Sequence, residues 1–358
     1  MNVTSRTDAA GPSSPRPAVS VVIPCRNERL HIARCLESLL AQEQPPGGFE
    51  LIIADGMSTD GTRTLLSRFA RDARVRVIDN PGQIVSTGLN AAVAVSRGDV
   101  IIRADVHTEY APDYVRQCVH TLETTGADNV GGPWVAVPQG YVGRAIAAAF
   151  HSRFGSGGAR AHDPHYEGAV DTVYLGCWRR ANLERLGGFD EELVRNQDDE
   201  LNFRIVRSGG RVWQSPRIRS WYHPRNSVSR LFRQYLQYGY WKVRVIRKHG
   251  TPASWRHVVP AAFVGTAAVL LVLAPVSATA RLGALVWVGA YLAATCVASV
   301  AEAARSGWSL LPILPVVFSA FHIGYGLGFL LGIIDTTVLR RRAARWSSAL
   351  TRASADRS

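Results

Sequence analysis

The chain reads Val100-Ile101-Ile102-Arg103-Ala104-Asp105-Val106-His107, an apolar run that ends in a carboxylate and an imidazole. The apolar part predicts a buried strand of a parallel sheet, and the polar part predicts a loop at its carboxyl end. Asp105 and His107 are two residues apart, so an extended chain directs both side chains to one side. Ligands of open α/β sheets bind at this edge. The stretch predicts half of a divalent-metal site; the alternative interpretation is that His107 only caps a turn.

Strand and helix patterns alternate around this stretch. Apolar, β-branched runs predict strands, and apolar residues at helical spacing predict the helices between them. The predicted strands cover 18–23, 49–54, 75–78 and 99–103, and the predicted helices cover 27–41, 60–70, 84–95, 112–122 and, further on, 190–207. Repeated strand-helix units form a mostly parallel sheet with helices on both faces. The predicted fold class is therefore a doubly wound α/β domain.

The last third of the chain is apolar. Uncharged runs cover 258–280 and 282–301, and a third run over 306–334 is interrupted only by His322. Each run reaches the roughly 20 residues that cross a hydrocarbon core, which predicts a transmembrane region over 257–338. The alternative is three buried helices of one large core. Prolines and glycines within the third run are also compatible with two short segments in place of one helix.

The formal net charge of +13 is unevenly distributed. Cations concentrate in residues 226–256, which carry no acidic residue and interleave the cations with aromatic and aliphatic side chains. This pattern predicts a basic amphipathic helix in a membrane interface, not a nucleic-acid site, and it places the domain over 18–225 in the cytoplasm. Five cysteines without a C-x-x-C pair fit reduced thiols there.

The two ends of the chain are polar. Residues 1–17 have the composition of a disordered lead, without the apolar core of a signal peptide. Residues 339–358 form a basic tail. Three crossings that start from a cytoplasmic domain would place this tail outside, against the positive-inside rule. An even number of crossings is therefore favoured, either because one apolar run is re-entrant or interfacial or because the third run is two short segments.

Three of the predicted strands end in polar motifs. These are Pro24-Cys-Arg-Asn-Glu28, Asp55-Gly-Met-Ser-Thr-Asp-Gly-Thr62 and Asp105-Val-His107. Neither the dinucleotide fingerprint nor a P-loop is present. In this order and spacing, the motifs resemble the nucleotide-sugar half of a family 2 glycosyltransferase with a GT-A fold, and the resemblance covers about 18–249.

The resemblance implies a set of donor-site residues. Asp55 would bind the base of a nucleoside diphosphate, and Pro24 and Glu28 would line its pocket. Asp105 would lie at the ribose and the metal, whereas His107 stands where the family usually has a second aspartate. Because imidazole is a better ligand for Mn²⁺ than for Mg²⁺, the substitution favours Mn²⁺ as the cofactor.

The resemblance also implies a catalytic base. Within Arg195-Asn-Gln-Asp-Asp-Glu-Leu-Asn-Phe-Arg204, Asp198 matches the aspartate that takes the acceptor proton, and Gln197 replaces the family's glutamate. A carboxylate near the start of a helix stays ionised for this task. The alternative is that Asp198 only complements the helix dipole. His223 is a candidate third metal ligand, or else a hydrogen-bonded residue without a metal.

Further motifs resemble the membrane-anchored exopolysaccharide glycosyltransferases of the succinoglycan type. They are Arg103-Ala-Asp-Val-His107, Gly155-Ser-Gly-Gly158, Asp171-Thr-Val-Tyr-Leu-Gly176 and Asp198-Asp-Glu-Leu-Asn202. This resemblance implies an inverting enzyme of the cell membrane that transfers sugar from a UDP-sugar to a polyprenyl diphosphate saccharide. It also allows membership of a polysaccharide-assembly complex.

Three other functions compete with this interpretation. One is a polyprenyl-phosphate sugar synthase, and another is a non-catalytic membrane subunit of a polysaccharide-assembly complex. The third is a processive polymer synthase, but the Gln-x-x-Arg-Trp segment of such enzymes is replaced by Gln234-Tyr-Leu-Gln-Tyr-Gly-Tyr-Trp241. Single addition is therefore the expected outcome.

Overall fold

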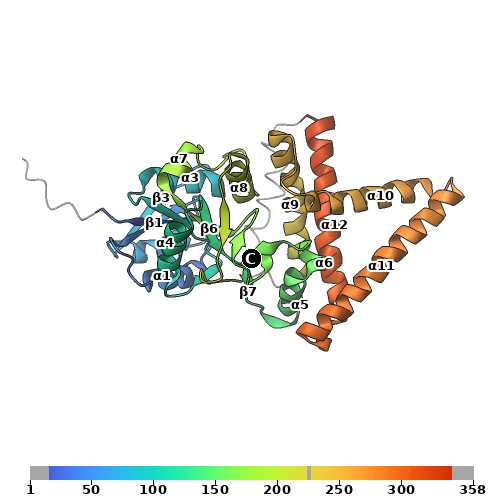
Figure 1. The fold of residues 1–358 in the computed structure, drawn as a ribbon, viewed down its shortest axis with the longest axis horizontal. Helices are drawn as coiled ribbons and strands as arrows, with labels where there is room; N and C mark the ends of the chain where they lie inside the picture. Colours follow the sequence, from blue (N-terminus) through green and yellow to red (C-terminus); the bar gives the residue numbers. More distant parts are fainter. Residues whose placement is uncertain (1–15, 224–226, 341–358) are drawn as a thin grey trace, which may run out of the picture.

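The computed structural model describes residues 16–223 and 227–340. Nearly all of the predicted N-terminal lead (1–17) and of the basic tail (339–358) lies outside these residues. The described chain forms an α/β domain, followed by four long helices (Figure 1).

An eight-stranded sheet is the centre of the α/β domain. Its order is β3-β2-β1-β4-β9-β6-β10-β8. The strands are β1 (Val19–Cys25), β2 (Phe49–Asp55), β3 (Val75–Asp79), β4 (Val100–Arg103), β6 (Asn129–Gly132), β8 (Gly168–Ala169), β9 (Tyr174–Arg179) and β10 (Val212–Gln214). The first four strands are parallel, whereas β9 is antiparallel to both β4 and β6. The mostly parallel sheet predicted from the sequence is confirmed.

Helices cover both faces of this sheet because its strands are apolar on both sides. One core joins the sheet to α1 (Ile32–Leu40), α2 (Thr62–Phe69) and α4 (Tyr114–Thr125). The other core joins it to α3 (Val85–Val95), α7 (Arg180–Arg185) and α8 (Gln197–Arg207). Both layers are visible in Figure 1.

The predicted helix over 190–207 is wrong in its first seven residues, because α8 begins only at Gln197. Asn196, just before it, has a left-handed φ of 61°, which interrupts a right-handed helix. This turn brings Asp198 into the first turn of α8. A second sheet, of order β5-β11-β7, was not predicted; its strands are β5 (Thr108–Tyr110), β7 (Val135–Ala136) and β11 (Ser220–Tyr222).

The region between β7 and β8 is helical. It contains α5 (Gly140–His151), α6 (Arg153–Ser156) and the short 3-10 turn η1 (Arg160–His162). Helix α5 packs on the C-terminal helices through Ala145, Ile146 and Ala149. The α/β domain therefore reaches the apolar part of the chain through this insertion.

The C-terminal region begins with α9 (Val228–His249). It continues through η2 (Trp255–His257), α10 (Val259–Leu273), α11 (Ala278–Ser306), η3 (Trp308–Leu310) and α12 (Leu314–Ile333), which ends in the π-turn η4 (Ile334–Val338). Within the described residues, three helical segments are long and apolar enough to cross a membrane: Trp255–Leu273, Ala278–Ser306 and Leu314–Val338. The third is one continuous helix, so the alternative of two short segments is wrong. Pro315 lies in its first turn, where no backbone donor is needed.

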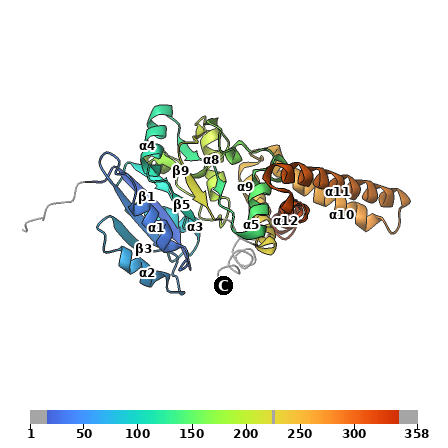
Figure 2. The same cartoon turned by 90° about the horizontal axis from the view of Figure 1, so that it is seen from below.

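These helices have two orientations. Helices α10 and α11 form a hairpin that extends away from the α/β domain, whereas α9 and α12 lie side by side across its base (Figures 1 and 2). In the apolar part of Leu314–Val338, 50% of the residues are buried, against 11% in Trp255–Leu273 and 17% in Ala278–Ser306. Helix α12 thus packs against protein along one side, unlike α10 and α11.

Candidate active site

The loops that follow β1 and β2 are tied together by hydrogen bonds. The Asn27 backbone N donates to Ser58 Oγ (2.8 Å), and the Thr59 N donates to Asn27 Oδ1 (2.8 Å). The Glu28 N donates to Thr62 Oγ1 (2.8 Å). Because both strands end at one edge of the sheet, these bonds hold the Glu28 carboxylate at that edge.

Asp55 ends β2 and is fully buried. Its Oδ1 accepts a hydrogen bond from Ser58 Oγ (2.5 Å), and its Oδ2 lies 3.1 Å from Arg63 Nε. The carboxylate thus has two partners within the protein, and its contact with a base stays a prediction. Pro24 and Asn80 line the adjacent cavity, at the ends of β1 and β3.

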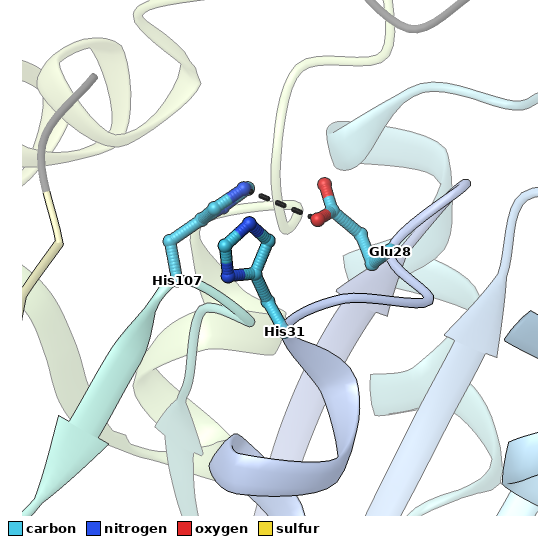
Figure 3. A group of neighbouring side chains, drawn as sticks. All are labelled: Glu28, His31 and His107. Carbon is cyan, nitrogen blue, oxygen red and sulfur yellow. Dashed lines mark ion pairs between the residues drawn. The ribbon is translucent and has the colours of Figure 1, made fainter. Parts of the chain in front are cut away.

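Glu28, His31 and His107 converge at the ends of β1 and β4 (Figure 3). One ligand atom from each lies within 4.8 Å of the others. His107 Nε2 is 3.1 Å from Glu28 Oε2, and its Nδ1 is 3.3 Å from Asp105 Oδ1. One carboxylate and two imidazoles form a mixed donor set that suits a first-row transition metal better than Mg²⁺. These three residues are called the Glu28 cluster below.

The Glu28 cluster contains strongly shifted groups. Burial lowers the pKa of His107, but hydrogen bonds to Asp105 and Glu28 outweigh burial and raise it to about 10. Burial raises the pKa of Asp105, but the imidazolium of His107 holds it well below its usual range. Burial and the nearby His107 lower the pKa of His31. A cationic His107 therefore lies between two carboxylates.

His31 is missing from the residues predicted from the sequence, although a signal for it exists. Glu28-Arg-Leu-His31 places a carboxylate and an imidazole three residues apart at the entrance to α1. Residues with this spacing lie on one side of a turn. Asp105, predicted as a metal ligand, is not in the group of three and contacts it through His107.

His223 lies directly after β11 and lines the same cavity. Its backbone N donates to the His107 carbonyl oxygen (3.0 Å). Its Nε2 lies 2.7 Å from Glu109 Oε1 on β5, and it is not a member of the Glu28 cluster. The role of His223 as a third metal ligand stays a prediction.

Asp198 lies across the cavity from the Glu28 cluster, in the first turn of α8. Its Oδ2 is 3.3 Å from Nη1 of Arg103, a buried residue at the end of β4. The carboxylate keeps about a third of its surface exposed to the cavity. A partly open carboxylate held by one cation can accept a proton from a hydroxyl group in the cavity.

Asp199 points to a different partner. Its Oδ2 accepts a hydrogen bond from Nζ of Lys242 on α9 (2.6 Å). Burial alone would raise the pKa of Asp199, but the Lys242 ammonium lowers it to about 2. Both aspartates line the cavity, but Asp199 pairs with Lys242 of α9, whereas Asp198 pairs with Arg103 of β4.

One cavity of about 1280 Å³ connects these groups. It is lined by the loops after β1, β2 and β3, by the Glu28 cluster and by Asp198. The C-terminal helices add apolar and aromatic side chains to the lining, among them Phe263, Phe321 and Tyr325. Trp134 also lines it and stacks on Tyr174 at 5.3 Å between ring centroids.

Several known proteins are similar to this chain in sequence or in fold. The family model for Glycosyl transferase family 2 matches residues 20–178. The chain is 33% identical to the succinoglycan biosynthesis protein ExoA of Rhizobium meliloti over 336 residues, which cover 90% of this chain and 96% of that protein. It is 24% identical to a dolichyl N-acetyl-α-D-glucosaminyl phosphate 3-β-D-2,3-diacetamido-2,3-dideoxy-β-D-glucuronosyltransferase of Methanococcus voltae, over 88% of this chain and 97% of that protein.

A solved structure has the same GT-A-like fold. It is a mannosyltransferase of Pyrobaculum calidifontis in complex with GDP-Man and Mn²⁺, which matches with a TM-score of 0.59 and 21% identity. The match covers 87% of each chain. From the family model, and from the full-length match to the succinoglycan protein, we conclude that the chain belongs to glycosyl transferase family 2.

Proposed function

We propose that this protein is an inverting glycosyltransferase that moves a sugar from a UDP-sugar to a polyprenyl diphosphate saccharide. The supporting observation is the single cavity that is lined both by the loops at the edge of the sheet with Asp198 and by apolar side chains of the C-terminal helices. The polar loops suit a nucleotide sugar. A lipid-linked acceptor has a polar head and an apolar chain, and the side chains of the C-terminal helices suit the latter.

The reaction is a single displacement. The acceptor hydroxyl oxygen forms a bond to the anomeric carbon, and the bond from that carbon to the diphosphate oxygen breaks. The hydroxyl proton passes to Asp198, and the electron pair leaves with the nucleoside diphosphate. Asp198 lies in the first turn of α8, and its ion pair with Arg103 holds the carboxylate in place.

The Glu28 cluster is the proposed site of a divalent cation. Glu28, His31 and His107 would hold it, the cation taking the place of the proton on Nε2 of His107, with Asp105 orienting His107 through their hydrogen bond. Bound there, Mn²⁺ would act as a Lewis acid toward the departing diphosphate. The mixed donor set favours Mn²⁺ over Mg²⁺.

The proposed setting is the cytoplasmic face of a cell membrane. The relative from Methanococcus voltae is named for transfer to a dolichyl-linked sugar phosphate, which supports a lipid-linked acceptor. The succinoglycan relative supports a role in exopolysaccharide or cell-surface glycan synthesis. A polysaccharide-assembly complex is a proposed partner on the same ground.

A donor and acceptor screen tests the proposal. Purified protein in lipid is incubated with UDP-sugars and other nucleotide sugars, with Mn²⁺ or Mg²⁺, and with polyprenyl diphosphate saccharide or polyprenyl monophosphate. We expect one β-linked sugar to be added to the diphosphate-linked acceptor from an α-linked UDP-sugar. Transfer to the monophosphate alone would identify a polyprenyl-phosphate sugar synthase. Donor binding without transfer to any acceptor would favour a non-catalytic subunit.

A further inference from the structure

Both ends of α12 contact elements on the side of the α/β domain. Just before its first turn, Tyr141 Oη of α5 donates a hydrogen bond to the Ser309 carbonyl oxygen (2.8 Å). At its last turn, Arg247 of α9 donates a hydrogen bond to the Thr336 carbonyl oxygen. A helix that crosses a bilayer from this domain would carry one end about 30 Å away from it. Both ends of α12 instead remain in contact with α5 or α9, beside the α/β domain.

The middle of α12 also lies on the domain. His322 Nε2 is 2.8 Å from the carbonyl oxygen of Phe154 in α6, and the Phe154 and Phe318 rings meet edge to face at 5.2 Å. Over its 25 residues, about 37 Å in length, the helix follows the base of the α/β domain.

Three glycines of α12 allow α9 to approach closely. A Cβ added to Gly324, Gly328 or Gly332 would lie 2.9, 1.9 or 2.8 Å from a carbonyl oxygen of α9. The three carbonyl groups belong to Phe232, Leu236 and Tyr240, which share the same spacing of four residues. The two backbones therefore run together over more than two turns.

Helix α9 is in turn fixed to the α/β domain. Lys242 Nζ donates to Asp199 (2.6 Å), His249 Nε2 lies 2.9 Å from Glu200, and Arg207 donates to the His249 carbonyl oxygen (2.8 Å). Glu200 is fully buried. Helix α12 is thus connected to the α/β domain through α9.

The outer face of α12 remains apolar and exposed. Val316 is 52% exposed and Ile334 is 48% exposed, with Leu327 and Leu331 between them. The hairpin is apolar and exposed as well, since Leu282, Leu285, Leu292 and Val297 of α11 are each more than half exposed. A membrane that surrounds the hairpin and contacts this face of α12 would cover both apolar surfaces.

The cations are unevenly distributed between the two ends of the hairpin. Arg256 at its start pairs with Asp171 of the α/β domain, and Arg305 lies at its end. Near the turn at 274–277, Arg281 is the only Lys or Arg between residues 258 and 304. Its start and end thus lie on the more basic side, together with Arg247 and Lys248 of α9.

We propose that α10 and α11 are the two membrane crossings, and that α12 lies with α9 in the membrane interface on the side of the α/β domain, its Val316–Ile334 face in contact with the lipid. Arg340, which follows α12 at the end of the described chain, then stays on the same side as the α/β domain. The partner of this surface is the acyl boundary of the bilayer, with anionic headgroups near the cations of α9.

Depth measurements in a bilayer test this arrangement. In a Cys296→Ser background, which leaves only buried thiols, single cysteines replace Val316, Leu327 or Ile334 on α12 and carry spin labels. Matched labels at Leu282, Leu292 and Val300 on α11 serve as the control for a crossing helix. In vesicles of neutral and anionic phospholipid, we expect equal, shallow depths along α12 and a maximum at Leu292 along α11. A maximum depth at Leu327 would overturn the proposal.

Labelling from each side of the membrane gives an independent readout. Val276→Cys marks the hairpin turn, Leu339→Cys the end of α12, and Glu37→Cys the α/β domain; all three positions are exposed. With a membrane-impermeant maleimide, we expect Leu339→Cys and Glu37→Cys to react from one side and Val276→Cys from the other. Reaction of Leu339→Cys from the side opposite Glu37→Cys would overturn the proposal. Nucleotide-sugar binding by each variant confirms that it is folded.

Discussion

The Arg103 guanidinium on β4 lies 3.3 Å from the Asp198 carboxylate on α8, measured from Nη1 to Oδ2. Arg103 is buried, and among the described residues its Nε has no hydrogen-bond partner, so the ion pair with Asp198 orients the side chain. Arg103 also helps to lower the pKa of Asp105, two residues along the chain. One cation thus acts both on the proposed base and on Asp105, the carboxylate that contacts His107 of the Glu28 cluster.

Asp198→Asn is expected to lower kcat by about a thousandfold, because a general base contributes roughly 10²- to 10⁴-fold to such a reaction. Binding of the nucleotide sugar, measured by calorimetry, should stay within about twofold, since Asp198 faces the acceptor hydroxyl. Glu192→Gln, an exposed carboxylate on the segment before α8, is the matched control with full activity. Near wild-type transfer by a folded Asp198→Asn protein would show that another group takes the proton.

His31→Ala is expected to weaken Mn²⁺ binding at least tenfold, because it removes one of three donors whose ligand atoms lie within 4.8 Å. The number and affinity of bound ions can be measured by electron paramagnetic resonance of free Mn²⁺. His120→Ala removes an exposed histidine of α4 and should leave the affinity unchanged. Equal affinity for both variants would exclude His31 as a ligand.

Asp199→Asn is expected to destabilise the protein by about 3 kcal/mol, because it leaves the buried Lys242 ammonium without its carboxylate. The melting temperature in detergent should fall. The double variant Asp199→Asn, Lys242→Met should recover much of the loss, since no unpaired charge is then buried. Additive losses in the double variant would mean that the two side chains do not act as a pair.

The same pair predicts a dependence of stability on pH. The pKa of Asp199 is about 2 in the folded protein, below its ordinary value of 3.8. The stabilisation by Asp199 is therefore complete above about pH 4 and is lost as the pH falls through 2. Melting temperatures between pH 2 and 6 should converge for the wild type and Asp199→Asn at the acid end. A constant difference across this range would contradict the assignment.

Gly328→Val is expected to separate α12 from α9, because a Cβ at this position would lie 1.9 Å from the Leu236 carbonyl oxygen. Overpacking of this kind costs about 3 kcal/mol. Gly289→Val on α11 is the control, since nothing lies within 4 Å of its added Cβ. We expect a lower melting temperature for the first variant only; equal values for both would show that the close approach is unimportant.

Much of the α/β domain could be predicted because its signals are local. A buried parallel strand needs a short β-branched run, so the sequence predicted β1, β2, β3 and β4 within one or two residues. The start of α8 could not be predicted in this way. Acidic residues occur on both sides of Asn196, and only its left-handed backbone separates the loop from the helix.

The candidate site also contains some residues that local sequence patterns predict and others that they do not. The ends of β1, β2 and β4 carry Glu28, Asp55 and Asp105, because parallel strands bring their carboxyl ends to one edge. His31 was missed because it lies in the turn before α1, outside the strand-end pattern. The ion pair between Arg103 and Asp198 joins residues that are 95 positions apart in the sequence. A local sequence pattern cannot predict a contact between residues so far apart in the chain.

The sequence by itself determined the α/β class, the edge of the sheet that carries the site and the three apolar segments, because each follows from local spacing of apolar and polar residues. The tertiary structure decided which groups meet: the Glu28 cluster, the pairing of Asp198 with Arg103, and the packing of α12 along α9. The hydropathy of α12 equals that of α10. Its contacts with α5, α6 and α9 distinguish α12 from α10. Hydropathy shows that a helix favours an apolar environment, but it does not show whether protein or lipid provides that environment.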